Sequence, residues 1–319
     1  MKALPKLISV VVPCHNESLT IDSLYRNLSR IFAADPEHRY ELVCVDDGSQ
    51  DDTLQKLQAL AKANGAVRVV AFSKNFGKEI ATTAGLRYAT GDAVVIVDAD
   101  GQHPVELIPK FIAKWEQGAK IVTGLRTGRQ ASLWKRAGSK LFYATLRRIT
   151  GVAMNPNTSD FRLIDKSVQT EFNRMTERHR ITRGLIDWFG YTQEHVPYEE
   201  NVRLAGTSPQ SFSKLFKLSI DSAISLSTSP LYLVAYIGAI VLPVATVLGL
   251  GMLANYALRD PLRLHATGGA YLIVLLLWLV GILLVSQGII GLYLSHIHTE
   301  TQNRPLFVVD AANSRSIVD

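Results

Sequence analysis

Cysteine is scarce in this chain of 319 residues, which contains two, Cys14 and Cys44. Both lie in apolar stretches expected to be buried strands, and their separation does not match the spacing of zinc ligands. A secreted fold held by disulfides is therefore not indicated, and reduced thiols packed in a core are expected. His15 and His103 also lack a His or Cys partner at zinc spacing, which favours packing or hydrogen-bonding roles for them.

Charged residues are missing from two long stretches near the C-terminus. No Asp, Glu, Lys or Arg lies between Asp221 and Arg259, or between Arg263 and Glu300. Each stretch is longer than the roughly 20 apolar residues that cross a bilayer. Both are expected to span a membrane, at residues 232–254 and 270–292.

The segment before the first stretch has the pattern of an amphipathic helix. Between Ser211 and Leu226, apolar side chains recur on one helical face, with Lys214, Lys217 and Asp221 elsewhere. This arrangement is typical of a helix that lies in a membrane interface. An ordinary surface helix packed on its own domain is the alternative.

Residues 1–6 contain no apolar signal-peptide region and no small-residue cleavage site, so the N-terminal part is expected in the cytosol. The formal net charge of +6 occurs without the aromatic and basic pattern of RNA-binding proteins. An anionic membrane surface is therefore favoured over nucleic acid as the partner. The expected organisation is a cytosolic domain at residues 1–210, a juxtamembrane amphipathic helix at 211–229, two transmembrane helices within 230–295 and a cytosolic tail at 296–319.

The first half of the chain alternates short β-branched runs with helical patterns, which is typical of βαβ units around a mostly parallel sheet. The predicted strands cover residues 7–13, 40–46, 66–72, 93–98 and 120–123. The predicted helices cover residues 18–32, 51–63, 78–88 and 105–115. Polar or acidic segments follow several of the strands, at the sheet edge where open α/β folds bind ligands.

An acidic pair follows the fourth of these strands. Asp98 and Asp100 come directly after an apolar run and lie two residues apart, which places both side chains on one side of an extended chain. Carboxylates at such a position hold a divalent cation that neutralises a departing diphosphate. Alone the pair is a weak signal, because acidic residues also cap helices.

Three segments at the strand ends form an ordered series: VVPCHNE at residues 11–17, VDDGSQD at 45–51 and DADGQHP at 98–104. With this series the sequence resembles glycosyltransferase family 2, the inverting enzymes of GT-A fold. Within it, the sequence is similar to the branch of dolichol-phosphate mannose synthase and the bacterial undecaprenyl-phosphate glycosyltransferases, whose bacterial members share a Ser-Thr-x-Pro segment before two C-terminal spans. The resemblance implies an α/β fold with a Rossmann-like, mostly parallel sheet, followed by an interfacial helix and a two-helix transmembrane hairpin.

The resemblance also implies roles for individual residues. The nucleotide-sugar donor is expected to contact Pro13, Asn16, Glu17, Asp47, Lys78 and Asp98. A Mg²⁺ or Mn²⁺ ion is expected on Asp98, Asp100 and Gln102. Catalytic roles fall to Asp100, Arg126 and Asp160. The acceptor phosphate is expected to meet Arg126, Arg203 and Ser208.

Two of these roles have alternatives. Asp160 matches the position usually discussed as a general base, yet a phosphomonoester is mostly dianionic at neutral pH and needs little deprotonation. Asp160 therefore acts either as a base or as an orienting group. Lys78 either meets a phosphate or is a solvated charge at the start of a helix. Pro209 and Gln210 stand where relatives often carry a basic residue or Tyr, which weakens the match around Arg203.

The predicted reaction is inverting transfer of a hexose or related sugar from a nucleotide sugar, with UDP favoured, to a polyprenyl phosphate, with undecaprenyl phosphate favoured. The enzyme is expected to be a multi-pass protein of the cytoplasmic membrane that contacts its lipids; self-association is left open. One alternative is a processive polysaccharide synthase, although the usual Gln-x-x-Arg-Trp segment is missing. Another is a non-catalytic nucleotide-sugar-binding partner of a flippase, which the joint presence of the acidic pair, Gln102 and Asp160 disfavours.

Overall fold

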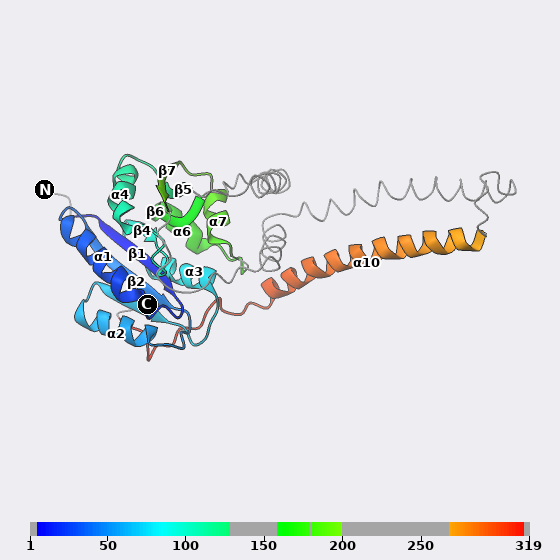
Figure 1. The fold of residues 1–319 in the computed structure, drawn as a ribbon, viewed down its shortest axis with the longest axis horizontal. Helices are drawn as coiled ribbons and strands as arrows, with labels where there is room; N and C mark the ends of the chain where they lie inside the picture. The colour runs from blue at the N-terminus through cyan, green and yellow to red at the C-terminus, as the bar shows by residue number, and fades with distance from the viewer. Residues whose placement is uncertain (1–4, 128–157, 179, 200–267, 316–319) are drawn as a thin grey trace. The chain divides into compact units, whose positions relative to one another are not determined.

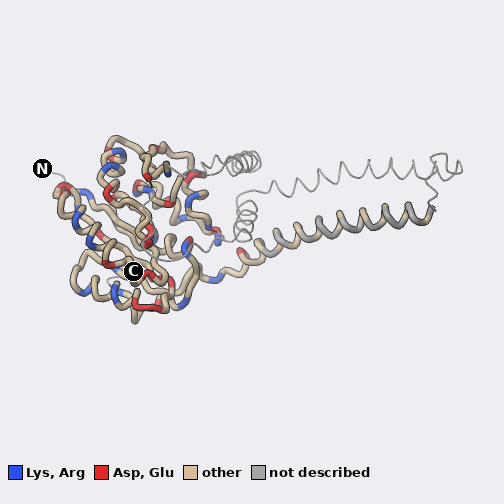
Figure 2. Tube along the Cα trace, in the orientation of Figure 1, with Lys and Arg blue, Asp and Glu red and all other residues tan. Residues whose placement is uncertain are grey.

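The computed structural model describes residues 5–127, 158–178, 180–199 and 268–315 of the chain. It contains two units. The first comprises Met1–Ser211 together with Arg304–Asp319, and the second comprises Phe212–Asn303. Lys, Arg, Asp and Glu residues occur throughout the described parts of the first unit (Figure 2).

The first unit is built on a seven-stranded sheet in the order β3-β2-β1-β4-β6-β5-β7. Its strands are β1 (Leu7–Cys14), β2 (Arg39–Asp46), β3 (Val67–Ala71), β4 (Ala93–Ile96), β5 (Ile121–Thr127), β6 (Thr158–Asp165) and β7 (Gln193–Glu199). Strand β6 runs antiparallel to β4 and β5, and the other pairs are parallel. The predicted α/β fold with a mostly parallel sheet is therefore confirmed.

Helices cover both faces of this sheet (Figure 1). One face carries α1 (Ile21–Ala34), α2 (Thr53–Ala63), the 3₁₀ turn η1 (Val105–Leu107) and α4 (Ile108–Glu116). The other face carries α3 (Lys78–Tyr88), α6 (Lys166–Arg174) and α7 (Thr182–Trp188). Because both faces are covered, the central strands read as continuous apolar runs.

Alternate residues of β1 show how the two faces are filled. Val10 and Val12 enter the core that contains Leu28 of α1 and Phe111 of α4. Val11 points to the opposite face, where a Cβ at Gly85 of α3 would lie 2.2 Å from its Cγ1. A side chain at residue 85 would therefore push α3 off the sheet. This close approach sets the distance between β1 and the helix whose first residue is Lys78.

The C-terminal part of the chain is described in two pieces. Helix α10 (Gly268–Thr301) covers the second predicted span, and its Leu272, Leu276 and Leu294 side chains are exposed. The first predicted span and the interfacial helix at residues 211–229 lie outside the described residues. Many α10 side chains also lie outside that description, and among the described residues no helix is long and apolar enough to cross a membrane. The predicted two-helix hairpin is thus not seen in the described structure.

Residues 304–315 return to the first unit after α10. They form bridges to the sheet at Val69, paired with Arg315, and at Phe72, paired with Val309. Figure 1 shows this red segment passing beside α2, where the Gln58 side chain donates a hydrogen bond to the Asn313 carbonyl (2.8 Å). A cytosolic tail was expected at residues 296–319; in the structure α10 continues to Thr301, and Arg304–Asp319 belongs to the same unit as the sheet.

Candidate active site

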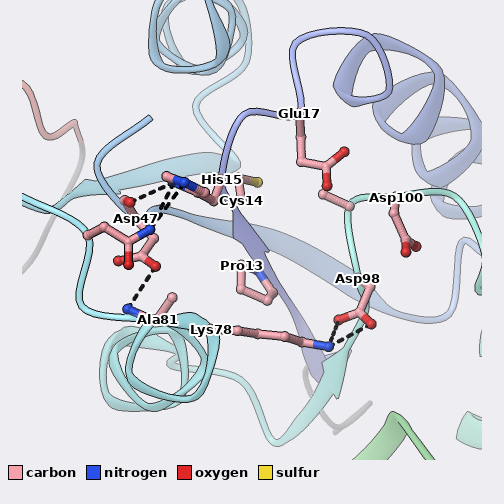
Figure 3. Close-up of a pocket in the computed structure, with 12 residues that line it drawn as sticks. Pro13, Cys14, His15, Glu17, Asp47, Lys78, Ala81, Asp98 and Asp100 are labelled. Atoms are coloured by element: carbon pink, nitrogen blue, oxygen red, sulfur yellow. Dashed lines mark hydrogen bonds and ion pairs between the residues drawn. The ribbon is translucent and has the colours of Figure 1, made fainter. Parts of the chain in front are cut away.

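A cleft of about 280 Å³ lies at the carboxyl-terminal edge of β1, β2 and β4 (Figure 3). It is lined by Pro13, Cys14, His15, Glu17, Asp47, Asn75, Gly77, Lys78, Ala81, Asp98, Ala99 and Asp100. Six of these residues were expected to contact the donor or the metal. The structure thus brings them together in one place, while their individual roles stay predictions.

Asp47 holds the loop between β3 and α3 in place. Asp47 as a whole is 2% exposed, and its carboxylate accepts backbone hydrogen bonds from Phe76 (2.6 Å) and Gly77 (2.9 Å). Burial raises the pKa of Asp47, and the two N–H donors act in the opposite direction. The family resemblance implies that Asp47 contacts the nucleotide-sugar donor. In the structure both of its oxygens already position the loop that leads to Lys78.

Gly48 lets two loops of the cleft pack closely. Its φ of +64° lies in the left-handed region, and a Cβ there would lie 2.6 Å from the carbonyl carbon of Lys74. We expect Gly48→Ala to lower the free energy of unfolding by about 1–3 kcal/mol through backbone strain alone. The contact would also displace the loop at residues 73–78 and raise the KM for the donor. Urea unfolding and donor kinetics measure the two effects.

Gly65→Ala is the matched control for this substitution. Nothing lies within 4 Å of a Cβ built at Gly65. Its effect on the free energy of unfolding is expected to stay within about 0.5 kcal/mol, as for an ordinary surface substitution. Equal behaviour of the two variants would show that the contact between Gly48 and Lys74 does not matter.

Lys78 links two acidic residues from neighbouring strands. Its Nζ lies 2.7 Å from the carboxylate of Asp98, which follows β4, and 3.1 Å from Oδ2 of Asp160 on β6. Burial favours the neutral amine, but the charges of the two carboxylates outweigh it and raise the pKa of Lys78 above its ordinary range. Lys78 is therefore a cation shared by two acids, and not merely a solvated charge at a helix start.

Asp160 is stabilised as an anion. Burial would raise its pKa, but the positive charges of Lys78, Arg162 and Arg183 outweigh burial and lower it below the usual range. Arg162 is almost fully buried and is held by Asp187 (3.3 Å). A carboxylate with so low a pKa is a weak base. The lowered pKa is thus consistent with the orienting alternative for Asp160, whose role stays a prediction.

The backbone of Asp98 is held by a neutral histidine. The Asp98 N–H donates to Nδ1 of His103 (3.0 Å), and the ring of His103 stacks on Phe161 with centroids 5.1 Å apart. Burial lowers the pKa of His103, which keeps the ring neutral and able to accept this hydrogen bond. The expectation that His103 packs and forms hydrogen bonds is confirmed.

Asp98 and Asp100 present two carboxylates to the cleft, and hard cations such as Mg²⁺ bind oxygen ligands of this kind. Asp100 Oδ1 accepts a hydrogen bond from the Gln102 backbone N–H (3.0 Å), while Gln102 is not among the lining residues. Among the residues that the structure describes, no three His, Cys, Asp or Glu side chains are grouped to hold a metal. The residues fit a cation that takes its remaining ligands from a bound diphosphate, as Mg²⁺ commonly does with phosphate substrates.

Two further predicted site residues that the structure describes, Asn16 and Arg126, are not among those that line this cleft. Asn16 stands beside it with a positive φ of 57° and accepts a hydrogen bond from the Gln50 N–H (2.8 Å), which joins the loops after β1 and β2. Arg126 is the last residue but one of β5, and its Nε donates to the hydroxyl of Tyr198 (3.4 Å). Arg203 and Ser208 lie outside the described residues.

The structure adds residues that the sequence analysis did not assign. A small pocket next to the cleft brings Glu79, Arg162 and Arg183 around Lys78 and Asp160. Burial raises the pKa of Glu79, and the nearby Asp160 charge adds to this effect. Arg162 lies two residues after Asp160 in the same segment, and this closeness in sequence could have identified it as a site residue. Nothing local in the sequence pointed to Arg183.

The residues that form the cleft fall within a stretch that matches a known protein family. Residues 9–177 match the model of glycosyl transferase family 2, and this match runs from the third residue of β1 to just past the end of α6. The chain belongs to glycosyltransferase family 2. The cleft of this family 2 glycosyltransferase is thus formed entirely by the matched part of the chain.

Full-length relatives extend the similarity beyond the matched domain. An uncharacterised glycosyltransferase of Synechocystis is 37% identical over 95% of this chain and 94% of its own length. A bactoprenol glucosyl transferase of Shigella phage SfX is 34% identical over 95% of this chain and 98% of its own. A solved structure of glucosyl-3-phosphoglycerate synthase from Mycobacterium tuberculosis with Mn²⁺, UDP-glucose and phosphoglyceric acid is 22% identical, covers 67% of this chain and 76% of its own, and has a TM-score of 0.45.

Proposed function

We propose that this glycosyltransferase moves a hexose from a nucleotide sugar to the phosphate of a polyprenyl phosphate. A UDP-sugar is the favoured donor and undecaprenyl phosphate, or bactoprenol phosphate, the favoured acceptor. The observation that carries the proposal is the near full-length similarity to proteins named bactoprenol glucosyl transferases. The cleft supports it, because Asp98 and Asp100 lie together at the edge of the sheet where α/β folds bind ligands.

In the proposed reaction an oxygen of the lipid phosphate attacks the anomeric carbon of the sugar. The bond from that carbon to the donor diphosphate breaks, its electron pair leaves with the nucleoside diphosphate, and the anomeric configuration inverts. A divalent cation on Asp98 and Asp100 would supply positive charge to the departing diphosphate. Lys78 keeps Asp98 and Asp160 in fixed positions, and Asp160 orients the acceptor without having to take a proton.

We further propose that residues 230–295 anchor the enzyme in the cytoplasmic membrane, with the cleft on the cytosolic side. The two uncharged stretches of the sequence and the exposed apolar side chains of α10 support this proposal. Resistance of the protein to carbonate extraction from membranes tests the membrane anchoring. Release into the soluble fraction at alkaline pH would contradict it.

The direct test of function is a transfer assay with a panel of donors. Purified protein in detergent is incubated with undecaprenyl phosphate, a divalent cation and one of UDP-glucose, UDP-galactose, UDP-N-acetylglucosamine or GDP-mannose. Mass spectrometry of the lipid fraction is expected to show one added sugar with a single preferred donor. A polymer would indicate a processive synthase, and donor binding without product would indicate the non-catalytic alternative.

A further inference from the structure

The C-terminal segment completes the edge of the sheet at β3. Val69 and Arg315 exchange two backbone hydrogen bonds, of 3.0 and 2.8 Å, and the Asp310 N–H donates to the Ala71 carbonyl (2.8 Å). The Ser314 hydroxyl accepts from the Ala71 N–H (3.0 Å). Because β3 is the last strand in the sheet order, these contacts pair backbone groups that an edge strand otherwise leaves unpaired.

The same segment reaches the start of the loop that enters the cleft. The Ser73 N–H donates to the carbonyl of Val308 (3.0 Å), one residue past Phe72. The ring of Phe307 stacks on Phe72 with centroids 5.1 Å apart and an interplanar angle of 19°. Phe72 is 4% exposed, and the C-terminal segment contributes to burying it through Phe307.

From Phe72 the contacts continue into the cleft itself. Phe72 meets Phe76 edge to face, with centroids 5.5 Å apart. The Phe76 N–H donates a hydrogen bond to Asp47. Lys78, two residues after Phe76, donates hydrogen bonds to Asp98 and Asp160. A continuous series of packed rings and hydrogen bonds therefore joins the C-terminal segment to the residues that line the cleft.

We propose that the C-terminal segment positions the donor-binding loop, with Phe307 acting through Phe72 and Phe76 as a positioning residue. Without the ring of Phe307, Phe72 loses a stacking partner and the loop at residues 73–78 loses its support on the side of β3. The identity of the ligand as a nucleotide sugar rests on the proposed function. The claim that the C-terminal segment positions the loop at residues 73–78 does not depend on the identity of the ligand, because it rests on contacts within the protein.

The test uses Phe307→Ala in the full chain. Hydrogen exchange at the Phe76 and Gly77 amides is expected to quicken, because both donate to Asp47 only while the loop holds its position. The KM for the preferred donor is expected to rise about three- to tenfold, in line with the loss of one aromatic contact. The kcat at saturating donor is expected to change less than the KM. Phe307→Tyr keeps the stacked ring and should restore both values.

Phe32→Ala is the matched control. Phe32 stacks on Tyr40 with centroids 4.1 Å apart, at the amino-terminal end of β2 and therefore at the sheet edge opposite the cleft. The substitution Phe32→Ala removes a similar ring stack, so it should reduce thermal stability. Hydrogen exchange at the Phe76 and Gly77 amides and the KM for the donor should stay unchanged. Phe307→Leu keeps most of the volume without a flat ring, and replaces Phe307→Ala if that variant fails to fold.

Unchanged exchange at Phe76 and Gly77 in a folded Phe307 variant would overturn the proposal, whatever the activity. Equal increases of the donor KM in the Phe307 and Phe32 variants would also overturn it, because the effect would then be one of general stability. If the wild-type protein transferred no sugar, the proposed function would fail, yet the exchange experiment would still decide whether the tail holds the loop.

Discussion

Asp100→Ala is expected to lower the rate of sugar transfer by on the order of a thousandfold while the protein stays folded. A cation at the departing diphosphate stabilises the transition state by several kcal/mol, and about 1.4 kcal/mol corresponds to a tenfold change in rate. Asp100 lines the cleft and lies outside the hydrophobic core, so its removal costs little packing. Initial rates across a Mg²⁺ or Mn²⁺ titration, with circular dichroism of the same samples, measure the effect.

Glu106→Ala is the control for loss of a negative charge nearby. Glu106 is exposed on η1, six residues further along, and does not line the cleft. The rate of sugar transfer by Glu106→Ala is expected to stay within about twofold of the wild-type rate, as surface substitutions have small effects. Turnover of Asp100→Ala within tenfold of the wild type, with the same dependence on added cation, would show that Asp100 does not hold the metal.

The central strands were predictable because their burial on both faces leaves a simple signature. Strands β1, β2 and β4 appear as apolar runs, each followed by a polar segment. Parallel strands bring those polar segments to the same edge. The meeting of Glu17, Asp47 and Asp98 in one cleft therefore followed from the order of the motifs alone.

Strand β6 was not predicted, because its sequence contradicts the usual pattern of a buried strand. Thr158–Asp165 contains Arg162 at a position that is 1% exposed, whereas arginine is mostly a surface residue. The ion pair with Asp187 satisfies this buried charge, and no local rule reveals such a distant partner. The antiparallel insertion of β6 beside β4 is also what carries Asp160 to Lys78. That pairing could not be derived without the sheet order.

The role of the C-terminal segment could not be predicted, because the segment lies far along the chain from the strand that it contacts, β3. The hydrogen bond between Ala71 and Ser314 joins residues 243 positions apart. A truncation after Ser211 would thus remove the second unit and also the partner of β3. Loss of activity in that truncation would not report on membrane attachment alone. A deletion confined to residues 212–303, with a flexible linker to Arg304, separates the two effects.

Lys78→Met is expected to lower transfer by roughly a hundredfold, comparable to the loss of one group that stabilises charge in an active site. It removes the cation between Asp98 and Asp160 and leaves two carboxylates close together. Burial then acts on Asp160 without the opposing charge and hydrogen bond of Lys78, so the pKa of Asp160 rises. Rates measured from neutral pH down into the acid range where the wild type loses activity, together with acid unfolding of both proteins, check the change.

The sign of the pH effect follows from the direction of the shift. In the wild type the pKa of Asp160 is lowered, so its ionised form stabilises the fold at neutral pH and is lost only well into the acid range. In Lys78→Met the loss begins at a higher pH, and both stability and activity should fall earlier on acidification. Lys78→Arg keeps the positive charge and should retain the wild-type acid limit. An unchanged acid limit in Lys78→Met would mean that Lys78 does not hold Asp160 in its ionised form.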